Sequence, residues 1–482
     1  MSKGSVVVLD VGKTLAKATL WSPARQMIER RSRPNERLLE DGLPCLDYMG
    51  IEHWLAETLE HFAQVAEIGA IIPVAHGASA CLVDKDRLAL APLDYEAVLP
   101  DAIRRDYEAL RDKFAVTGSP RLPAGLNLGA QLFWLQSERP DKFARGHILT
   151  WPQYWAWRLS GVEATEVTSL GCHSDLWLPA GKRPSPMAVK LGWAERFAPL
   201  HDASDVLGTV VTRWRSSTGL PRHCRILCGI HDSNAAFLAS RLHPEIGNRE
   251  CTVLSTGTWF VAMRSLPGAA ESPRLAEHRD CLFNVDVAGN PVPSSRFMGG
   301  REAELLEASE GSFVDVASHS AELLLLAKRM IADGVFALPT FEAGVGPYPQ
   351  KIGRWIDRPD DKLARRAATG LYLALMADSS LDLIGARSRI IIEGRFGGDP
   401  VFTRALASLR PDDSVYLSNA RDNVAFGALG LLDGAVPAGS EMTRVDRLDF
   451  DIAQYAGHWR ELVARAGVEG VPIINEAREM RQ

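Results

Sequence analysis

The sequence lacks any long hydrophobic run, and no apolar stretch approaches the roughly 20 residues that a membrane-spanning helix requires. It also lacks a strong excess of one charge, since 54 Lys and Arg stand against 60 Asp and Glu, a net charge of −6. A strongly basic surface, of the kind that binds nucleic acids or anionic membranes, is therefore not indicated. The chain leads directly into a β-branched run without a signal-peptide pattern, and we expect a cytoplasmic protein with neither partner.

Cysteine is scarce, with seven residues scattered through the chain. An odd number in a long sequence favours reduced thiols over a disulfide framework. One group, His223, Cys224, Cys228 and His231, raises the alternative of a zinc site. The run that ends at Cys228 has the pattern of a strand, in which residues four apart are separated by about 13 Å. This is too far to share one metal ion, and we predict small buried thiols instead.

The opening stretch combines a buried strand with polar chemistry at its end. Val6 to Leu9 lead to Asp10 and Gly12, and a second apolar run then ends at Trp21, which predicts a β-hairpin. Gly12 lets the backbone bend and approach a ligand. Carboxylate oxygens such as those of Asp10 suit Mg²⁺, and Lys13 and Thr14 offer donors for phosphate oxygens. An ordinary core hairpin with an incidental turn is the alternative.

A P-loop is the other interpretation of Gly12-Lys13-Thr14. That motif requires a further glycine five residues before Gly12 and a helix after the threonine. The required position holds Val7, and the following residues have a strand pattern. The P-loop is therefore rejected.

The length of 482 residues is too great for one core, so two domains are expected. The opening pattern returns beyond Gly247: a strand over 250–254, a turn over Ser255 to Trp259, and a strand over 260–263. Two halves that each begin with a phosphate-facing hairpin would place a nucleotide between them. We predict domains over 1–246 and 247–482.

The remaining patterns indicate alternating helices and strands. Helices are expected over 50–69, 127–159, 233–240, 362–383, 400–409 and 449–480, strands over 70–75, 80–84, 225–228, 389–393 and 414–417, and an irregular segment over 165–186. The tryptophans of 127–159 fall at helical spacing, which is typical of helix packing rather than a ligand platform. The segment 423–430 carries small residues suited to close helix packing.

Four segments, in chain order, resemble motifs of the FGGY family of carbohydrate kinases, within the group of ATP-using folds that includes Hsp70 and actin. The resemblance covers nearly the whole length. The segments are Asp10-x-Gly12-x-Thr14 with Lys17 (first phosphate loop), Gly229-x-His231-Asp232 (catalytic aspartate), Ser255-Thr256-Gly257-Thr258-Trp259 (second phosphate loop) and Gly394-x-x-Gly397-Gly398 (adenosine loop). Lys13 stands where the family more often has threonine or alanine, and Arg395 and Phe396 interrupt the usual glycine-rich run.

The resemblance implies an α/β fold of two actin-like (ribonuclease H-like) domains, with mixed sheets flanked by helices and the active site in the interdomain cleft. It implies transfer of the γ-phosphoryl group of ATP, with Mg²⁺, to a hydroxyl of a small sugar. The turn at Ser255 to Trp259 resembles that of L-rhamnulose and L-fuculose kinases, which favours an L-ketose as substrate.

The same resemblance, read with the chemistry of the side chains, assigns the site residues. Asp232 stands where a strand gives way to a helix and is predicted to be the catalytic base, and Asp10 to hold Mg²⁺ through water. Nucleotide binding is assigned to Gly12, Lys13, Thr14, Lys17, Ser255, Thr256, Gly257, Thr258, Gly394, Gly397 and Gly398. Sugar binding is assigned to His76, Gly77, Asp94, Tyr95, Glu96, His231, Trp259 and Phe297.

Several alternatives stay open from the sequence. Asp232 could serve only as a helix N-cap, and Trp259 could stack on substrate or fill the core. The protein could be a xylulose, ribulose or glycerol-type kinase, a non-catalytic sugar sensor, or an actin- or Hsp70-like ATPase. The sequence does not fix the sugar, the hydroxyl phosphorylated, or the oligomeric state, for which a homodimer is one option.

Overall fold

The opening hairpin is confirmed. In the computed structural model, which describes residues 4–247, 249–266, 273–307, 316–419, 422–435 and 441–465, strand β1 (Ser5–Val11) pairs antiparallel with β2 (Leu15–Trp21). Backbone N–H of Gly12 donates to the carbonyl of Leu15 at 3.0 Å and closes the turn. The register places Asp10 directly opposite Lys17.

The chain divides into two compact units. Unit 1 comprises Met1–Asn248, Leu282–Val292 and Arg421–Ser440, and unit 2 comprises Arg249–Cys281, Pro293–Ala420 and Glu441–Gln482. Unit 1 is therefore built from three separate stretches of sequence, two of which follow the point where the chain first leaves it.

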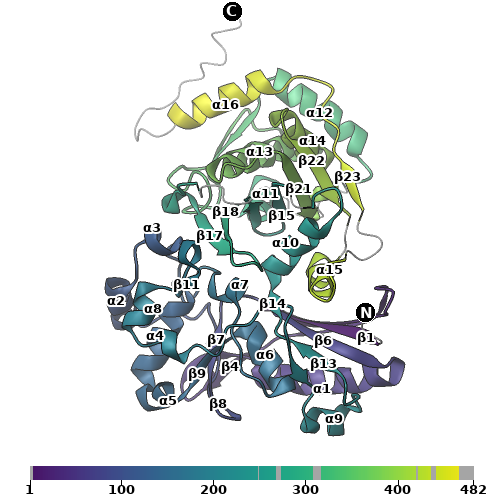
Figure 1. The fold of residues 1–482 in the computed structure, drawn as a ribbon. Helices are drawn as coiled ribbons and strands as arrows, with labels where there is room; N and C mark the ends of the chain where they lie inside the picture. Colours follow the sequence, from purple (N-terminus) through teal and green to yellow (C-terminus); the bar gives the residue numbers. More distant parts are fainter. Residues whose placement is uncertain are drawn as a thin grey trace, which may run out of the picture. The chain divides into compact units, whose positions relative to one another are not determined.

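The main sheet of unit 1 is mixed and has seven strands, in the order β12-β13-β6-β1-β2-β3 with β14 also paired to β6 (Figure 1). Strands β1, β6 and β13 run parallel to one another. Strand β2 is antiparallel to β1, β3 is antiparallel to β2, and β12 is antiparallel to β13. The bounds are β3 Met27–Pro34, β6 Ile68–Ala75, β12 Val206–Thr209, β13 Arg225–Leu227 and β14 Ile230–His231.

Helices bury both faces of this sheet because its side chains alternate between two hydrophobic clusters. Val7, Leu9 and Val11 pack with α1 (Tyr48–Val65), α6 (Trp151–Ser160) and α9 (Thr212–Thr218). Val6 and Val8 pack on the opposite face with α10 (Asp232–Leu242) and α15 (Asn423–Gly430). The strand end at Asp10 is thus held between two packed layers.

The second sheet also has seven strands and repeats the topology of the first. Its order is β17-β18-β16-β15-β21-β22-β23. Counting from β18, the pairings are antiparallel, antiparallel, parallel, parallel and antiparallel, which is the sequence found from β3 to β12 in unit 1. The bounds are β15 Cys251–Thr256, β16 Phe260–Ser265, β17 Cys281–Val285, β18 Pro291–Phe297, β21 Arg389–Gly394, β22 Ser414–Ser418 and β23 Met442–Arg444. The predicted mixed α/β architecture with two helix-flanked sheets is confirmed.

The other elements complete the two units (Figure 1). The remaining helices are α2 Asp101–Leu110, α3 Phe114–Thr117, α4 Leu128–Glu138, α5 Pro140–Arg145, α7 Val167–Leu170, α8 Pro186–Lys190, α11 Gly299–Glu307, α12 Ser320–Ala332, α13 Lys362–Leu383, α14 Pro400–Leu409 and α16 Ala453–Arg465. The remaining strands are β4 Arg37–Glu40, β5 Leu43–Leu46, β7 Ala80–Asp84, β8 Arg87–Leu90, β9 His147–Thr150, β10 Trp177–Leu178, β11 Arg183–Pro184, β19 Phe336–Leu338 and β20 Arg354–Ile356. The predicted helices over 362–383 and 400–409 have these bounds, and the part of the predicted 449–480 helix beyond residue 465 lies outside the described residues.

The segment 127–159 is not one helical region, because β9 interrupts it and pairs with β7. The tryptophans of this segment are buried, as predicted for packing residues. None of the seven cysteines forms a disulfide and all are buried, and Cys224 and Cys228 flank β13 as expected.

No helix among the described residues is both long enough and apolar enough to cross a membrane.

Candidate functional site

Asp10 is the penultimate residue of β1, and its carboxylate is ion-paired with Lys17 on β2. Lys17 is therefore engaged by the predicted metal ligand rather than free to meet a phosphate group. The turn beyond it favours glycine, since a Cβ at Gly12 would lie 3.1 Å from the carbonyl oxygen of Leu15. Asn35, which the sequence reasoning missed, braces this turn by donating from Nδ2 to the Gly12 carbonyl at 2.9 Å.

The contacts of Lys13 differ from the phosphate binding that was predicted for it. Its ammonium is ion-paired with Asp94, lies 3.9 Å from Glu96 and sits 4.9 Å from the ring centroid of Tyr95. These three residues were predicted to bind sugar, so Lys13 joins the sugar-side loop to the phosphate turn. Thr14 is exposed at the tip of that turn.

His76 and Gly77 follow β6 and are buried. Nδ1 of His76 accepts from the Ala78 N–H at 3.4 Å, while Nε2 has no hydrogen-bond partner among the described residues. Burial lowers the pKa of His76 to about 4, so the ring is neutral at pH 7 and carries its proton on Nε2. The Tyr95 ring lies edge-on at 5.1 Å. A buried donor without a partner is what a ligand hydroxyl would satisfy.

Asp232 is the first residue of α10, and His231 occupies the N-cap position without a capping side-chain bond. The N-cap alternative for Asp232 is therefore wrong. Its Oδ1 accepts from Ser233 N–H at 2.5 Å and Ser233 Oγ at 3.2 Å, and lies 3.1 Å from Nε2 of His231. All three contacts are made by Oδ1. Among the described residues, Oδ2 has no hydrogen-bond or ion-pair partner. The side chain is 30% exposed.

The charge state of Asp232 follows from these contacts. Burial alone would raise its pKa, but the hydrogen bond and charge of His231, with His76 and the Ser233 N–H, hold that pKa well below its usual range. The carboxylate is consequently ionised at neutral pH.

Three carboxylates of unit 1 act on one another. Burial raises the pKa of Asp10 to about 6, Lys17 opposes this, and the charges of Asp232 and Asp422 raise it further. Asp422 caps α15 by accepting from Ala425 N–H at 3.3 Å. Sequence reasoning missed it, although an Asp before a run of small residues is a helix-start signal.

The carboxylate oxygens of Asp10 and its neighbours suit Mg²⁺ because of their charge. A buried carboxylate that resists ionisation beside two others would be relieved by a cation, and Mg²⁺ prefers oxygen ligands. The described residues contain no group of three or more His, Cys, Asp or Glu side chains arranged to hold a metal ion. Asp10 would thus supply one ligand, and water and phosphate oxygens the others.

In unit 2, the polar residues at the end of β15 are already engaged. Ser255 donates to the Glu393 carboxylate, and Thr256 Oγ1 donates to the Glu393 carbonyl at 2.6 Å while accepting from Phe396 N–H at 3.1 Å. These hydroxyls tie β15 to β21. The Gly257 N–H donates to the Trp259 carbonyl at 3.0 Å, and Thr258 is exposed.

Two predicted sugar ligands lie in unit 2. Trp259 is half-buried with the Arg296 guanidinium 4.9 Å from its ring, so it does not fill the core. Phe297 is 1% exposed, and its ring lies 4.9 Å from that of Phe260, its cross-strand neighbour. The prediction that Phe297 contacts sugar is therefore corrected: it is a core residue.

The predicted adenosine loop follows β21. Gly394 has φ of +88°, and a Cβ there would lie 2.3 Å from the Thr256 carbonyl oxygen, so only glycine fits. Gly397 and Gly398 precede Asp399, which caps α14 through Val401 and Phe402 N–H. A Cβ at Gly398 would meet no atom within 4 Å, and this surface is open.

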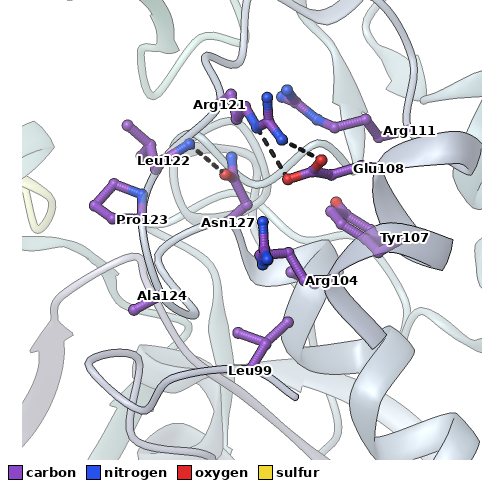
Figure 2. A pocket seen from close by; sticks show the side chains of 11 residues that line it. Leu99, Arg104, Tyr107, Glu108, Arg111, Arg121, Leu122, Pro123, Ala124 and Asn127 are labelled. Carbon is purple, nitrogen blue, oxygen red and sulfur yellow. Dashed lines mark hydrogen bonds and ion pairs between the residues drawn. The ribbon is translucent and has the colours of Figure 1, made fainter. Parts of the chain in front are cut away.

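A separate pocket of about 310 Å³ lies between α2 and the loop before α4 (Figure 2). Its three arginines each have a carboxylate partner: Arg121 with Glu108, Arg111 with Asp175, and Arg104 with Asp101. None of the predicted site residues lines it. Its charges are balanced, and it carries no part of the chemistry above.

Comparison with known proteins gives matches over the whole chain. Residues 248–440 match the family described as carbohydrate kinase FGGY, C-terminal domain. A carbohydrate kinase from Novosphingobium aromaticivorans is 47% identical, with 97% of this chain and 100% of that chain covered and a TM-score of 0.93. No curated protein sequence matches.

Two more distant structures share the fold. Xylulose kinase from Rhodospirillum rubrum has 19% identity and a TM-score of 0.71 over 96% of this chain and 98% of that one. Plasmodium falciparum glycerol kinase with ADP has 11% identity and a TM-score of 0.75 over 97% and 99%.

Proposed function

Given that the chain belongs to the FGGY family of carbohydrate kinases, we propose that it transfers the γ-phosphoryl group of ATP to a hydroxyl of an L-ketose of the L-rhamnulose or L-fuculose type. The observation that carries this proposal is the state of Asp232. It is an ionised carboxylate whose Oδ1 is fixed by His231 and Ser233 while Oδ2 is left to accept a proton.

Asp232 then acts as the base. Phosphoryl transfer requires mainly positioning and charge neutralisation, with one group to guide the attacking hydroxyl. Oδ2 accepts the hydrogen of the sugar hydroxyl, and takes the proton as the oxygen attacks phosphorus. The lowered pKa of Asp232 keeps the carboxylate ionised at neutral pH, which is the form that can accept this proton.

The sugar is held by the groups around Asp232. The Nε2–H of His76, buried and without a partner, donates to a sugar oxygen. Tyr95 lies against this ring, and Lys13 fixes the loop of Asp94 and Glu96. His231 keeps the base in place. These neutral and charge-paired groups favour a neutral polyhydroxylic substrate, because an anionic one would face the Asp232 charge.

The nucleotide is assigned to the two glycine turns and to the loop after β21. Backbone N–H groups around Gly12 and Gly257 and the exposed hydroxyls of Thr14 and Thr258 suit phosphate oxygens. The open surface at Gly397 and Gly398 suits the adenosine. Asp10 would hold Mg²⁺ through water, and bound Mg²⁺ would neutralise phosphate charge.

A coupled ADP-release assay over L-rhamnulose, L-fuculose, D-xylulose, L-ribulose and glycerol tests the proposal. The largest kcat/KM is expected with an L-ketose. A preference for D-xylulose, L-ribulose or glycerol would contradict the substrate class while keeping the reaction. ATP binding without turnover on any of these would contradict catalysis and favour a sugar sensor, and sugar-independent ADP release would favour an ATPase.

A further inference from the structure

Cys172 is buried next to the base and has no part in the function proposed above. Its Sγ lies 3.6 Å from Nε2 of His231. The same nitrogen lies 3.1 Å from Oδ1 of Asp232. The thiol is 3% exposed, and it and the carboxylate meet at one edge of the imidazole ring.

The other ring nitrogen fixes the proton. Nδ1 of His231 lies 3.0 Å from the amide nitrogen of Asn234. The amide N–H donates to Nδ1 when the ring is neutral, and Nε2 then carries a hydrogen, as it also does in the charged ring. That hydrogen points toward both Asp232 and Cys172. A small rotation of the ring would therefore change how well Nε2 meets the carboxylate.

The main chain around Cys172 also holds His231. Glu166 caps α7 by accepting from Thr168 N–H at 2.9 Å, and Thr168 Oγ1 accepts from the N–H of His231 at 3.1 Å. Cys172 follows two residues after this helix. One short segment thus fixes the backbone of His231 and presents the thiol to its ring.

Gly77 packs against both the Cys172 side chain and the His231 ring. A Cβ at this position would lie 2.8 Å from Cβ of Cys172 and 3.1 Å from Cδ2 of His231. The thiol and the ring are therefore packed closely against the backbone at Gly77.

We propose that Cys172 is a positioning residue for phosphoryl transfer. Its thiol holds the His231 ring so that Nε2 stays directed at Oδ1 of Asp232, and Oδ2 stays available to the sugar hydroxyl. The inference rests on Asp232 being the base.

Titratable groups act on His231 from several elements: Asp232 at the start of α10, Glu166 and Cys172 on the two sides of α7, and His76 after β6. Burial alone would lower the pKa of His231, but Cys172 and Asp232 raise it well above its usual value. Removing the thiol should therefore lower the pH at which His231 loses its proton.

The test compares Cys172→Ala and Cys172→Ser with Cys81→Ala, which removes a fully buried thiol from β7. Cys172→Ala should lower kcat by up to about 100-fold, the cost of misplacing a catalytic group by about 1 Å, with KM for ATP unchanged. Cys172→Ser should recover part of kcat, because a hydroxyl still accepts from Nε2. Cys81→Ala should keep kcat even if its Tm falls. Equal losses of kcat in Cys172→Ala and Cys81→Ala would overturn the proposal.

A second measurement does not depend on turnover. The His231 signal in ¹⁵N-histidine NMR spectra is assigned through His231→Gln. The titration of His231 should move to lower pH in Cys172→Ala. If the alanine variant does not fold, Cys172→Ser is measured in its place. An unshifted titration overturns the proposal, and so does a shifted titration with unchanged kcat. Absence of turnover in the wild type with every sugar contradicts the kinase proposal instead, and the titration alone then decides the role of Cys172.

Discussion

The Asp10 carboxylate and the Lys17 ammonium face each other across the β1–β2 ladder and form an ion pair. Even so, burial holds the pKa of Asp10 at about 6, against an ordinary value of 3.8. The charged form of Asp10 is therefore destabilised by burial even within this ion pair. A cation bound with a nucleotide would stabilise the negative charge there.

Asp10→Asn should make the protein more stable at pH 8. Because the pKa of Asp10 is raised in the folded state, the folded protein binds this proton more tightly than the unfolded chain. That stabilisation is complete below about pH 4 and is lost as the pH rises through about 6. The variant has no charge to bury, so its free energy of unfolding should exceed that of the wild type by about 1–3 kcal/mol at pH 8 and match it near pH 4.

Denaturant unfolding at both pH values measures this difference, and Asp86→Asn in the β7–β8 turn is the control. A variant less stable than the wild type at pH 8 would mean that the lost Lys17 pairing outweighs burial. Sugar phosphorylation should fall in Asp10→Asn despite the gain in stability.

Asp232→Asn should abolish sugar-dependent turnover while ATP still binds. The amide keeps the shape but cannot take the proton, and loss of a general base costs about 10²–10⁴-fold in kcat. The coupled assay and equilibrium ATP titration measure the two effects. Asp205→Asn, which alters an exposed aspartate paired with His201, should leave kcat unchanged. Turnover of Asp232→Asn at the wild-type rate would disprove the base assignment.

Lys13→Met should raise KM for sugar by several-fold and leave KM for ATP nearly unchanged. The ammonium pairs with Asp94, which is 3% exposed, and removing it leaves this carboxylate with the Arg37 guanidinium and the Glu96 N–H. An incompletely paired buried carboxylate costs about 1–3 kcal/mol, and the loop of Tyr95 should loosen. Steady-state kinetics in each substrate separates the effects, with Lys85→Met as control. A rise confined to KM for ATP would restore the phosphate role predicted from sequence.

Gly427→Ala should destabilise unit 1. A Cβ at Gly427 would lie 1.7 Å from the Ala235 carbonyl oxygen, so α15 and α10 would have to separate. Overpacking of this kind costs about 1–3 kcal/mol or more. Gly457→Ala on α16, where a Cβ meets nothing within 4 Å, should instead keep or raise stability. Thermal unfolding compares the two, and an unchanged Tm for Gly427→Ala would contradict the close crossing.

Local patterns were sufficient for much of the fold. The opening hairpin, the long helix α13 and the small-residue face of α15 were predicted from residues adjacent in sequence, and the structure confirms them. The second hairpin was found because it repeats the first. These elements have long or regular patterns, which is where periodicity is most informative.

Features set by distant partners could not be predicted. Strand β9 is four residues long between helices, and only its pairing with β7 defines it. Phe297 is buried because Phe260 lies opposite, and the hydroxyls of Ser255 and Thr256 are used by β21. Lys13 turns toward Asp94, 81 residues along the chain. Asp232 and Asp10 were predicted from motifs, whereas Cys172 has no local signature, and the helix-start signal at Asp422 does not reveal that its charge acts on Asp10.

Helix α15 has a consequence for how the protein is made. It packs on β1 and α10, although more than 180 residues separate it from the end of α10. Until these residues are synthesised, the sheet face that carries Val6, Val8 and Ile72 has α10 but lacks α15. A nascent chain in that state offers an apolar surface to chaperones or to other chains. A truncation before residue 422 would thus damage the beginning of the protein as well as its end.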